Sequence, residues 1–406
     1  MFQHTADGHH MVLYLRHLVR AAAERGWRVD LVTTRAALAH PAYAVVRAEA
    51  GDVLDTFMMD DITFPARPNA VRLLLHQLKL HRIYARAFRR YQAQRSCDVV
   101  YVGNMDHCDR AIALLGSPFG AVPFVGMSIS IRHHHRAMGV RGPGTRHDAL
   151  YARLFERLLR VKTLRALATI DETLPRYARQ QRISGCRKVH HVADVARLHG
   201  TADRAAVRTS LGIAPDDIVV LAYGALDPRK GIAELIAAAA SPACSTRVVV
   251  LLAGRQNAFV RDLLKGADAQ QLRTAHRLVE VSGFLGDQRE VDVFSATDIV
   301  WVAYRRFYGA SGVLIQAGAM RLPVVACEDG LIGWTTHRHG LGEIVDPGSR
   351  ESVTAAINRL AGDDALRRTY GANGAQLAAA HTPEAFGTRL CNVIASAATL
   401  PEPLHP

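Results

Sequence analysis

The stretch IVVLAYGALDPRKGI, residues 218–232, decides the fold class of this 406-residue chain. Its first six residues are apolar and rich in β-branched side chains, as in a strand buried on both faces. A turn with glycine, aspartate and proline follows, and a helical pattern begins at residue 231. A buried strand that runs through a basic, glycine-containing turn into a helix predicts a parallel α/β domain.

The same alternation continues on both sides of this stretch. After it, strands are expected at 247–253, 279–282, 298–303, 323–326 and 342–345. Before it, where the pattern is noisier, strands are expected at 28–33, 98–102, 121–127, 166–170 and 188–192. The predicted fold class is α/β, with Rossmann-like doubly wound domains at 1–200 and 201–382. Residues 383–406, a helix and a tail, are expected to pack back toward the N-terminal domain.

The chain opens differently from most domains of this class. Residues 1–8 are loop-like, and a helix is expected at 10–25 with Gly26 as its stop signal. Because a parallel α/β domain normally begins with a strand, we expect the start to be truncated and the first strand to be missing, with a minimal first strand as the alternative.

The basic residues are concentrated in the N-terminal half. Residues 1–200 contain 30 Lys and Arg against 16 Asp and Glu, whereas residues 201–406 contain 20 against 21. A basic half suggests an acidic substrate, an anionic membrane surface or nucleic acid as a partner. The sequence shows no helix-turn-helix, zinc-finger or aromatic RNA-binding signature, so no nucleic-acid partner is expected.

The segment 71–95 is a basic helix candidate in that half. Its apolar residues, such as Leu80 and Phe88, fall mostly on one helical stripe, and its arginines fall largely off that stripe. One interpretation is an amphipathic helix that lies on an anionic membrane surface. The other is a surface helix whose apolar side packs into the core, as amphipathic helices in globular proteins usually do.

The cysteine pattern and the hydropathy of the chain indicate the cellular compartment in which the protein is expected. The six cysteines are scattered without C-x-x-C spacing, which gives no support to a zinc site of that type and favours reduced thiols. The longest apolar stretches fall short of the ~20 residues that a spanning helix needs. We expect a cytoplasmic protein that can also sit at the inner face of a membrane.

Three loops that follow expected strands hold the candidate ligand-binding residues. The first contains Gly224, Arg229 and Lys230, which offer a tight backbone and positive charge for a phosphate. Lys230 is one of only five lysines among 50 basic residues. The alternative is an ordinary exposed basic turn.

The second loop, 305–312, leads into a helix with Ser311 as the expected N-cap, and Gly309 and Gly312 allow a ligand to approach the backbone. The third, 282–286, places Phe284 between glycines, where it would pack on a nucleobase or serve as the core residue of a turn. For the second loop, the alternative is a capped helix start with no ligand.

These motifs resemble the retaining GT-B glycosyltransferases of the family 4 type, also called glycosyl transferases group 1. The matching elements are GALDPRKGI at 224–232, SGFL at 282–285, SGVLIQAGAMRLPVVA at 311–326 and GLGEIVDPG at 340–348. The opening DGHHMVLYLRHL at 7–18 is similar to the glycine loop and first helix of such enzymes. The resemblance is strong over 217–362 and weak over 40–165.

The resemblance implies two domains that face each other across a cleft, with a nucleotide-diphosphate-sugar donor bound mainly by the C-terminal one. It implies no cofactor and no metal requirement. By position, Lys230 would hold the diphosphate, and the amides of Ser311 to Val313 would hold its distal phosphate. Phe284 and Leu285 would flank the base, and Gly8 would let the N-terminal loop approach the donor. The candidate substrate-binding residues are therefore Gly8, His9, Gly224, Phe284, Leu285, Tyr308, Gly309, Ser311, Gly312, Val313 and Gln316.

The chain departs from the family pattern at its most polar positions. The family usually has two glutamates eight positions apart, and here these positions hold Tyr308 and Gln316. Gln316 can still hydrogen-bond ribose hydroxyls, whereas Tyr308 cannot replace a carboxylate. The family also usually has an arginine where this chain has Ala225, so Arg229, Arg305 or Arg306 would supply that charge.

The N-terminal half offers histidines and a carboxylate pair on loops after strands. Family members often place a histidine against the donor sugar, and His107 or His133 would fill that role ahead of His9 and His10. Three consecutive histidines, 133–135, point in different directions in most conformations, so one metal held by all three is not expected. Asp171 and Glu172 would orient an acceptor hydroxyl or cap the next helix.

We therefore expect a retaining glycosyltransferase that transfers a hexose-type sugar to a glycan or lipid-linked acceptor in cell-surface polysaccharide or glycolipid synthesis. The predicted catalytic residues are Lys230, Arg229, His133 and His107. The alternatives are a nucleotide-sugar-binding pseudoenzyme that partners an active transferase, and a sugar-nucleotide epimerase, which needs no acceptor.

Overall fold

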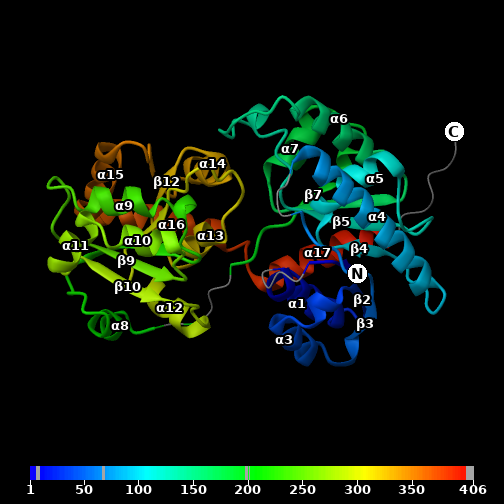
Figure 1. The fold of residues 1–406 in the computed structure, drawn as a ribbon, viewed down its shortest axis with the longest axis horizontal. Helices are drawn as coiled ribbons and strands as arrows, with labels where there is room; N and C mark the ends of the chain where they lie inside the picture. Colours follow the sequence, from blue (N-terminus) through cyan, green and yellow to red (C-terminus); the bar gives the residue numbers. More distant parts are fainter. Residues whose placement is uncertain (6–9, 66–68, 197–199, 201, 399–406) are drawn as a thin grey trace. The chain divides into compact units, whose positions relative to one another are not determined.

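The computed structural model describes residues 1–5, 10–65, 69–196, 200 and 202–398. The chain divides into two compact units. Unit 1 comprises Met1–Met138, Pro143–Val195 and Thr382–Pro406, and unit 2 comprises Gly139–Gly142 and Ala196–His381. Each unit is built around its own parallel sheet (Figure 1). The two doubly wound α/β domains expected from the sequence are confirmed.

Unit 2 contains a six-stranded sheet in the order β10-β9-β8-β11-β12-β13. Its strands are β8 (Ile218–Tyr223), β9 (Val248–Gly254), β10 (Leu278–Ser282), β11 (Ile299–Val302), β12 (Val324–Cys327) and β13 (Gly342–Val345). Its helices are α8 (Arg204–Ser210), α9 (Ile232–Ala239), α10 (Ala258–Leu263), α11 (Ala267–Thr274), α12 (Asp287–Ser295), α13 (Gly312–Ala319), α14 (Gly330–His339), α15 (Arg350–Gly362) and α16 (Asp364–Ala378).

Helices cover both faces of this sheet. Val220 and Ala222 of β8 point into a core shared with α9 and α15, whereas Val219 and Leu221 point into a second core shared with α12 and α13. The strand order reverses between the neighbours β8 and β11. In doubly wound sheets, ligands bind at the carboxyl ends of the strands at this reversal.

Unit 1 contains a seven-stranded sheet in the order β3-β2-β1-β4-β5-β6-β7. Its strands are β1 (Phe2–Gln3), β2 (Val29–Thr33), β3 (Leu54–Met58), β4 (Val100–Val102), β5 (Phe124–Ser128), β6 (Leu164–Thr169) and β7 (Val189–His191). Its helices are α1 (Arg16–Ala23), α2 (Arg35–Leu38), α3 (Pro41–Ala50), α4 (Ala70–Gln92), α5 (Asp109–Leu115), α6 (Asp148–Leu159), α7 (Thr173–Gln180) and α17 (Pro383–Ala398). The reversal of strand order in this sheet lies between β1 and β4.

Two strands of unit 1 differ from expectation. A first strand is present, although β1 has only two residues, and it pairs with both β2 and β4. The strand β3 was not predicted, because its sequence LDTFM mixes polar and apolar residues. It lies at the edge of the sheet, pairs only with β2 and is only partly buried, so it does not need a continuous apolar run.

The last described helix, α17, belongs to unit 1 and lies along α1 (red and dark blue in Figure 1). The rings of Tyr14 and Phe386 stack with centroids 4.9 Å apart. Gly387 allows the close approach, since a Cβ there would lie 2.7 Å from the carbonyl oxygen of His17 and 2.8 Å from Cβ of Ala21. Within the described residues, no helix is long and apolar enough to span a membrane.

Replacing Gly387 with alanine should lower the stability of unit 1, because the new methyl group meets backbone that must move. We expect a loss of about 1–3 kcal/mol, as for other overpacked sites, measured by thermal or denaturant unfolding. Gly362→Ala is the matched control, since a Cβ there meets nothing within 4 Å. Equal stability of the two variants would contradict the α1–α17 contact.

Candidate functional site

The loop that follows β8 is fixed by two features of its sequence. The side chain of Asp227 accepts a hydrogen bond from the amide of Arg229 at 2.9 Å and caps a short 3₁₀ turn, Pro228–Lys230. Gly231 then adopts a left-handed conformation with φ of 68°, and a Cβ there would lie 2.7 Å from the carbonyl oxygen of Ala303. Only glycine therefore allows the backbone at residue 231 to pack against the end of β11 and continue into α9.

Lys230 is a buried cation at the reversal of strand order in unit 2, with 6% of its surface exposed. Its Nζ donates a 2.6 Å hydrogen bond to the hydroxyl of Tyr304 and lies 4.1 Å from the centroid of that ring. In the described part of the chain, Tyr304 is the one acceptor found for this ammonium group. Since an ammonium group has three donors, this arrangement leaves donor capacity for an anionic ligand. Gly224 lies beside this ammonium group, since a Cβ added to Gly224 would be 3.8 Å from Nζ of Lys230.

The arginines near Lys230 have different surroundings. The guanidinium of Arg229 lies 4.8 Å from the ring centroid of Phe307. Arg305 is paired with Glu234 of α9, which neutralises its charge locally. Arg306 is exposed and has a left-handed φ of 53°. The Nε of Arg229 also lies 3.8 Å from Oδ1 of Asp227, so Arg229 and Arg305 each have a carboxylate nearby.

The second predicted loop follows β11, the strand next to β8, and so reaches the same edge of the sheet. Ser311 stands at the N-cap of α13, and its side chain forms no capping hydrogen bond. The first backbone amides of a helix have no partner within the helix, so those of Gly312 and Val313 are available to a ligand. Gly309 packs against Phe307 in this loop. The structure thus places the Lys230 loop and the start of α13 after neighbouring strands.

The third loop contains the most exposed large apolar side chain among the described residues. Phe284 is 90% exposed at the end of β10, so the alternative of a core phenylalanine does not hold. Leu285, by contrast, is buried in the core of unit 2, and its side chain packs away from solvent. A flat ligand at this edge would contact Phe284 by its side chain and Leu285 by its backbone.

The two divergent positions of the family pattern lie in different surroundings. Gln316 of α13 is buried and donates a hydrogen bond to the carboxylate of Glu290 on α12, which is also buried. Tyr308 is partly exposed and lies against Gly142. Glu290 was missed by sequence reasoning, because nothing in a helical glutamate indicates that it faces the next helix.

In unit 1, a chain of hydrogen bonds occupies the reversal between β1 and β4. The hydroxyl of Tyr84 lies 2.7 Å from Nδ1 of His4, and Nε2 of His4 lies 2.8 Å from Nδ1 of His107. Burial raises the pKa of Tyr84 well above its ordinary value, which keeps its hydroxyl protonated. His107 was predicted; its partner His4 was missed, although it directly follows the short first strand.

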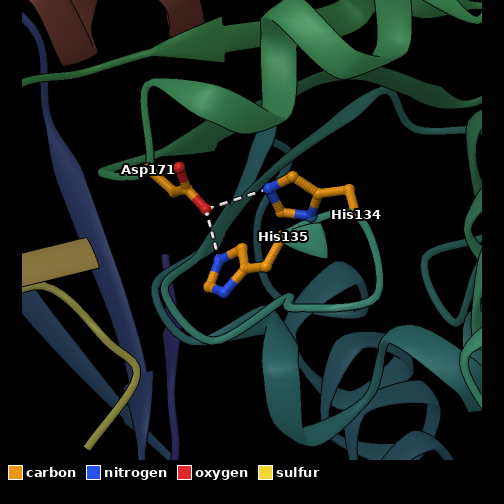
Figure 2. Close-up of side chains that lie close together, drawn as sticks. All are labelled: His134, His135 and Asp171. Carbon is orange, nitrogen blue, oxygen red and sulfur yellow. Dashed lines mark hydrogen bonds and ion pairs between the residues drawn. The ribbon is translucent and has the colours of Figure 1, made fainter. Parts of the chain in front are cut away.

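The consecutive histidines separate into two environments. The ring of His133 packs against Phe155 and Tyr177, and burial lowers its pKa to about 3, so it stays neutral at physiological pH. His134 and His135 instead both reach Asp171, which follows β6 (Figure 2). Burial alone would raise the pKa of Asp171, but the hydrogen bonds from the two rings lower it below its ordinary value.

Two predicted site residues, Gly8 and His9, lie outside the described residues. The others fall into separate groups. Lys230, Gly224 and the start of α13 lie at the β8–β11 reversal of unit 2, and Phe284 lies at the end of β10. His107 lies at the β1–β4 reversal of unit 1, and His133 lies in the packed loop after β5.

Residues 203–377 match the model of the family described as "Glycosyl transferases group 1". The resemblance to glycosyl transferases group 1 is thereby confirmed over these residues. Among curated proteins, the chain is similar to the D-inositol 3-phosphate glycosyltransferases of Rhodococcus opacus (31% identity over 179 residues) and Rhodococcus jostii (32% over 174 residues). These matches cover 43% and 41% of this chain. They span 39% and 38% of those proteins, about two fifths of their length.

Solved structures match almost the whole chain at low sequence identity. Anabaena Alr3699/HepE in complex with UDP and glucose has a TM-score of 0.64 and 17% identity, covering 97% of this chain and 98% of that one. Sucrose-phosphate synthase from Thermosynechococcus elongatus has a TM-score of 0.64 and 19% identity, covering 94% and 91%. The lipopolysaccharide glycosyltransferase WaaG has a TM-score of 0.57 and 14% identity, covering 97% and 98%. The fold is therefore GT-B.

The carboxyl group of Asp109, two residues after His107, has a pKa raised by its surroundings. Asp109 begins α5, where it accepts hydrogen bonds from the amide of Arg110 at 2.7 Å and from Gln77 at 2.9 Å. Burial, together with the charge of Asp106, raises its pKa to about 7. Because this folded-state pKa exceeds the unfolded value of about 3.9, folding favours the protonated acid. The contribution of Asp109 to stability is therefore full below about pH 4 and is lost as the pH rises through 7.

Asp109→Asn should remove this pH dependence, since the amide keeps an acceptor oxygen and never ionises. We expect the variant to gain about 1–2 kcal/mol relative to wild type at pH 8 and little at pH 4, a modest figure because the side chain is partly solvent-accessible. Melting temperatures across this range provide the measurement, with the exposed Asp52→Asn as the control for charge. A gain that does not change with pH would contradict the shifted pKa.

Proposed function

We propose that this chain, whose residues 203–377 have the glycosyl transferases group 1 pattern, is a retaining glycosyltransferase that uses a nucleotide-diphosphate-sugar donor. The observation that supports this best is the buried ammonium group of Lys230. It lies at the reversal of strand order, with Tyr304 as its one described acceptor, and the start of α13 follows the neighbouring strand. A buried cation and free helix amides suit a diphosphate better than an uncharged ligand.

In the proposed reaction, the bond from the anomeric carbon to the donor diphosphate breaks, and a bond to an acceptor hydroxyl oxygen forms. The proton of that hydroxyl passes to the departing diphosphate oxygen. Lys230 and the amides of Gly312 and Val313 would stabilise the negative charge that develops on the departing diphosphate. These groups supply that charge stabilisation from the chain itself, so we propose that transfer requires no metal. His107, oriented by His4, would contact the sugar or the acceptor hydroxyl.

We propose a uridine nucleotide as the first donor to test. Phe284 offers an exposed ring to a nucleobase, and the structural relative Alr3699/HepE was solved with UDP, with UDP-glucose, and with UDP and glucose. For the acceptor we propose an anionic glycan or lipid-linked molecule of cell-surface polysaccharide or glycolipid synthesis. The basic half of the chain supports this, and so do relatives named for D-inositol 3-phosphate.

A second candidate function is donor binding without turnover. Tyr308 stands where the family pattern has a glutamate, and Gln316 engages the carboxylate of Glu290. A protein of this kind would bind the nucleotide sugar and release no nucleotide in the presence of any acceptor. An epimerase would convert the donor sugar with no acceptor present, so product analysis separates the three functions.

Lys230→Met should weaken binding of UDP and UDP-glucose about 10- to 100-fold, because a hydrogen bond to a charged group contributes about 1.5–3 kcal/mol. The methionine keeps the length of the side chain and removes its charge. Isothermal titration calorimetry gives the affinities. Lys265→Met, at an exposed lysine paired with Asp262, is the matched control.

The donor site would be wrong if none of UDP, GDP, ADP and their sugars raised the melting temperature of the wild-type protein. It would also be wrong if Lys230→Met and Lys265→Met bound the nucleotide equally well. Tight donor binding without transfer to a panel of acceptors would instead support the second candidate function.

The helix α4 limits how the protein could bind a membrane. Its apolar stripe, including Leu80, Tyr84 and Phe88, is buried in the core of unit 1, so it cannot enter a bilayer while the unit is folded. Exposed cations occupy the opposite side. Arg86 and Arg90 pair with Asp60. We propose that the remaining charges attract an anionic membrane surface electrostatically.

The cations of α4 with no ion pair among the described residues are Lys79, Arg82 and Arg89, which share one helical face at 3.6 residues per turn. Replacing all three with glutamate should abolish binding to vesicles that contain phosphatidylserine, since each basic residue near such a surface contributes about 1 kcal/mol. Vesicle co-sedimentation measures the fraction of protein bound to these vesicles. Exposed cations of unit 2, replaced as Arg261→Glu, Lys265→Glu and Arg289→Glu, form the control. Equal binding by both triple variants would contradict the α4 surface.

A further inference from the structure

A cluster of two histidines and one aspartate lies at the carboxyl edge of the unit 1 sheet. His134 and His135 belong to the loop after β5, and Asp171 follows β6, which pairs with β5. Parallel neighbouring strands bring their carboxyl ends to the same edge, so residues almost 40 positions apart in the sequence meet here. All three side chains are buried, with exposed fractions of 0%, 7% and 3%.

Both histidine rings contact the same carboxylate oxygen. Oδ2 of Asp171 lies 3.0 Å from Nε2 of His134 and 3.0 Å from Nε2 of His135, and one ligand atom from each residue lies within 4.8 Å of the others (Figure 2). Around a tetrahedral ion with bonds of 2.0–2.1 Å, neighbouring ligand atoms are about 3.3 Å apart. The ring-to-carboxylate distances are thus within a few tenths of an ångström of those that a shared ion requires.

The carboxylate is already held in the orientation that such a site needs. Its other oxygen, Oδ1, accepts hydrogen bonds from the amide of Thr173 at 2.8 Å and from the hydroxyl of Thr173 at 2.6 Å. Oδ2 is therefore left to face the two rings. The same hydroxyl lies 2.9 Å from Nε2 of His134.

The geometry points to a divalent transition-metal site formed by His134, His135 and Asp171. Two imidazole nitrogens and one carboxylate oxygen suit Zn²⁺, whereas Mg²⁺ and Ca²⁺ prefer oxygen ligands alone. The ion would join the loop after β5 to the turn before α7. Because the ligands are buried, the role of the ion is structural.

The neighbouring histidine provides a matched control. His133 is adjacent in sequence and partly buried, but its ring packs against Phe155 and Tyr177 and does not reach Asp171. A variant at His133 therefore tests whether any loss of metal comes from the cluster itself or from disturbance of the loop.

The test is Zn²⁺ binding by the full-length protein without a histidine tag, after removal of metal by a chelator. We expect one Zn²⁺ per chain by titration and elemental analysis, and a higher melting temperature with Zn²⁺ than with EDTA or Mg²⁺, since a bound ligand stabilises the folded state. His134→Gln and His135→Gln should each weaken Zn²⁺ binding at least 10-fold, and His133→Gln should not.

Two results would overturn the site. One is wild-type protein that binds no stoichiometric Zn²⁺ and melts at the same temperature with and without it, which would show Asp171 to be only a hydrogen-bond acceptor for both rings. The other is unchanged affinity in His134→Gln and His135→Gln. The wild-type measurements remain decisive if either variant fails to fold, and the visible absorption of bound Co²⁺ reports on the ligands independently.

Discussion

The close approach of Gly231 to the end of β11 is the constraint on which the proposed donor site depends. With a Cβ there, the chain would collide with the carbonyl oxygen of Ala303, and the loop after β8 would have to move outward. The indole nitrogen of Trp301 donates a 2.8 Å hydrogen bond to the carbonyl oxygen of Lys230. The backbone amide of Arg305 donates a 2.7 Å hydrogen bond to the carbonyl oxygen of Arg229. These contacts join the loop to the neighbouring strand and hold the ammonium group of Lys230 against Tyr304.

Unit 2 could be predicted from sequence because its strands are buried on both faces. Strands such as β8 and β9 must then be continuous apolar runs, and their ends are marked by glycine, proline and charge. The position of Lys230 at the β8–β11 reversal follows from that topology. Its partner Tyr304 could not be predicted, since an aromatic residue after a strand has many packing partners available.

Unit 1 was harder, and the reasons are physical. The central strand β1 spans two residues, and the edge strand β3 is only partly buried, so neither leaves a clear periodic signal. The convergence of His134 and His135 could not be deduced either. Adjacent residues usually point apart, and here an irregular loop, free of the strict alternation of a strand, turns both rings toward one carboxylate.

The two polar clusters of unit 1 differ in a way that separates their roles. The Tyr84–His4–His107 chain lies at the β1–β4 reversal, where doubly wound sheets bind ligands, and it ends in a partly exposed ring. The histidine–aspartate cluster lies two strand pairs along the sheet, between β5 and β6, and its side chains are buried. The two clusters therefore share no residue, and the proposed roles of His107 and Asp171 can be tested separately. A structural metal ion in unit 1 is thus compatible with the proposed sugar transfer. In that proposal Lys230, the one buried lysine among the described residues, stabilises charge together with the start of α13.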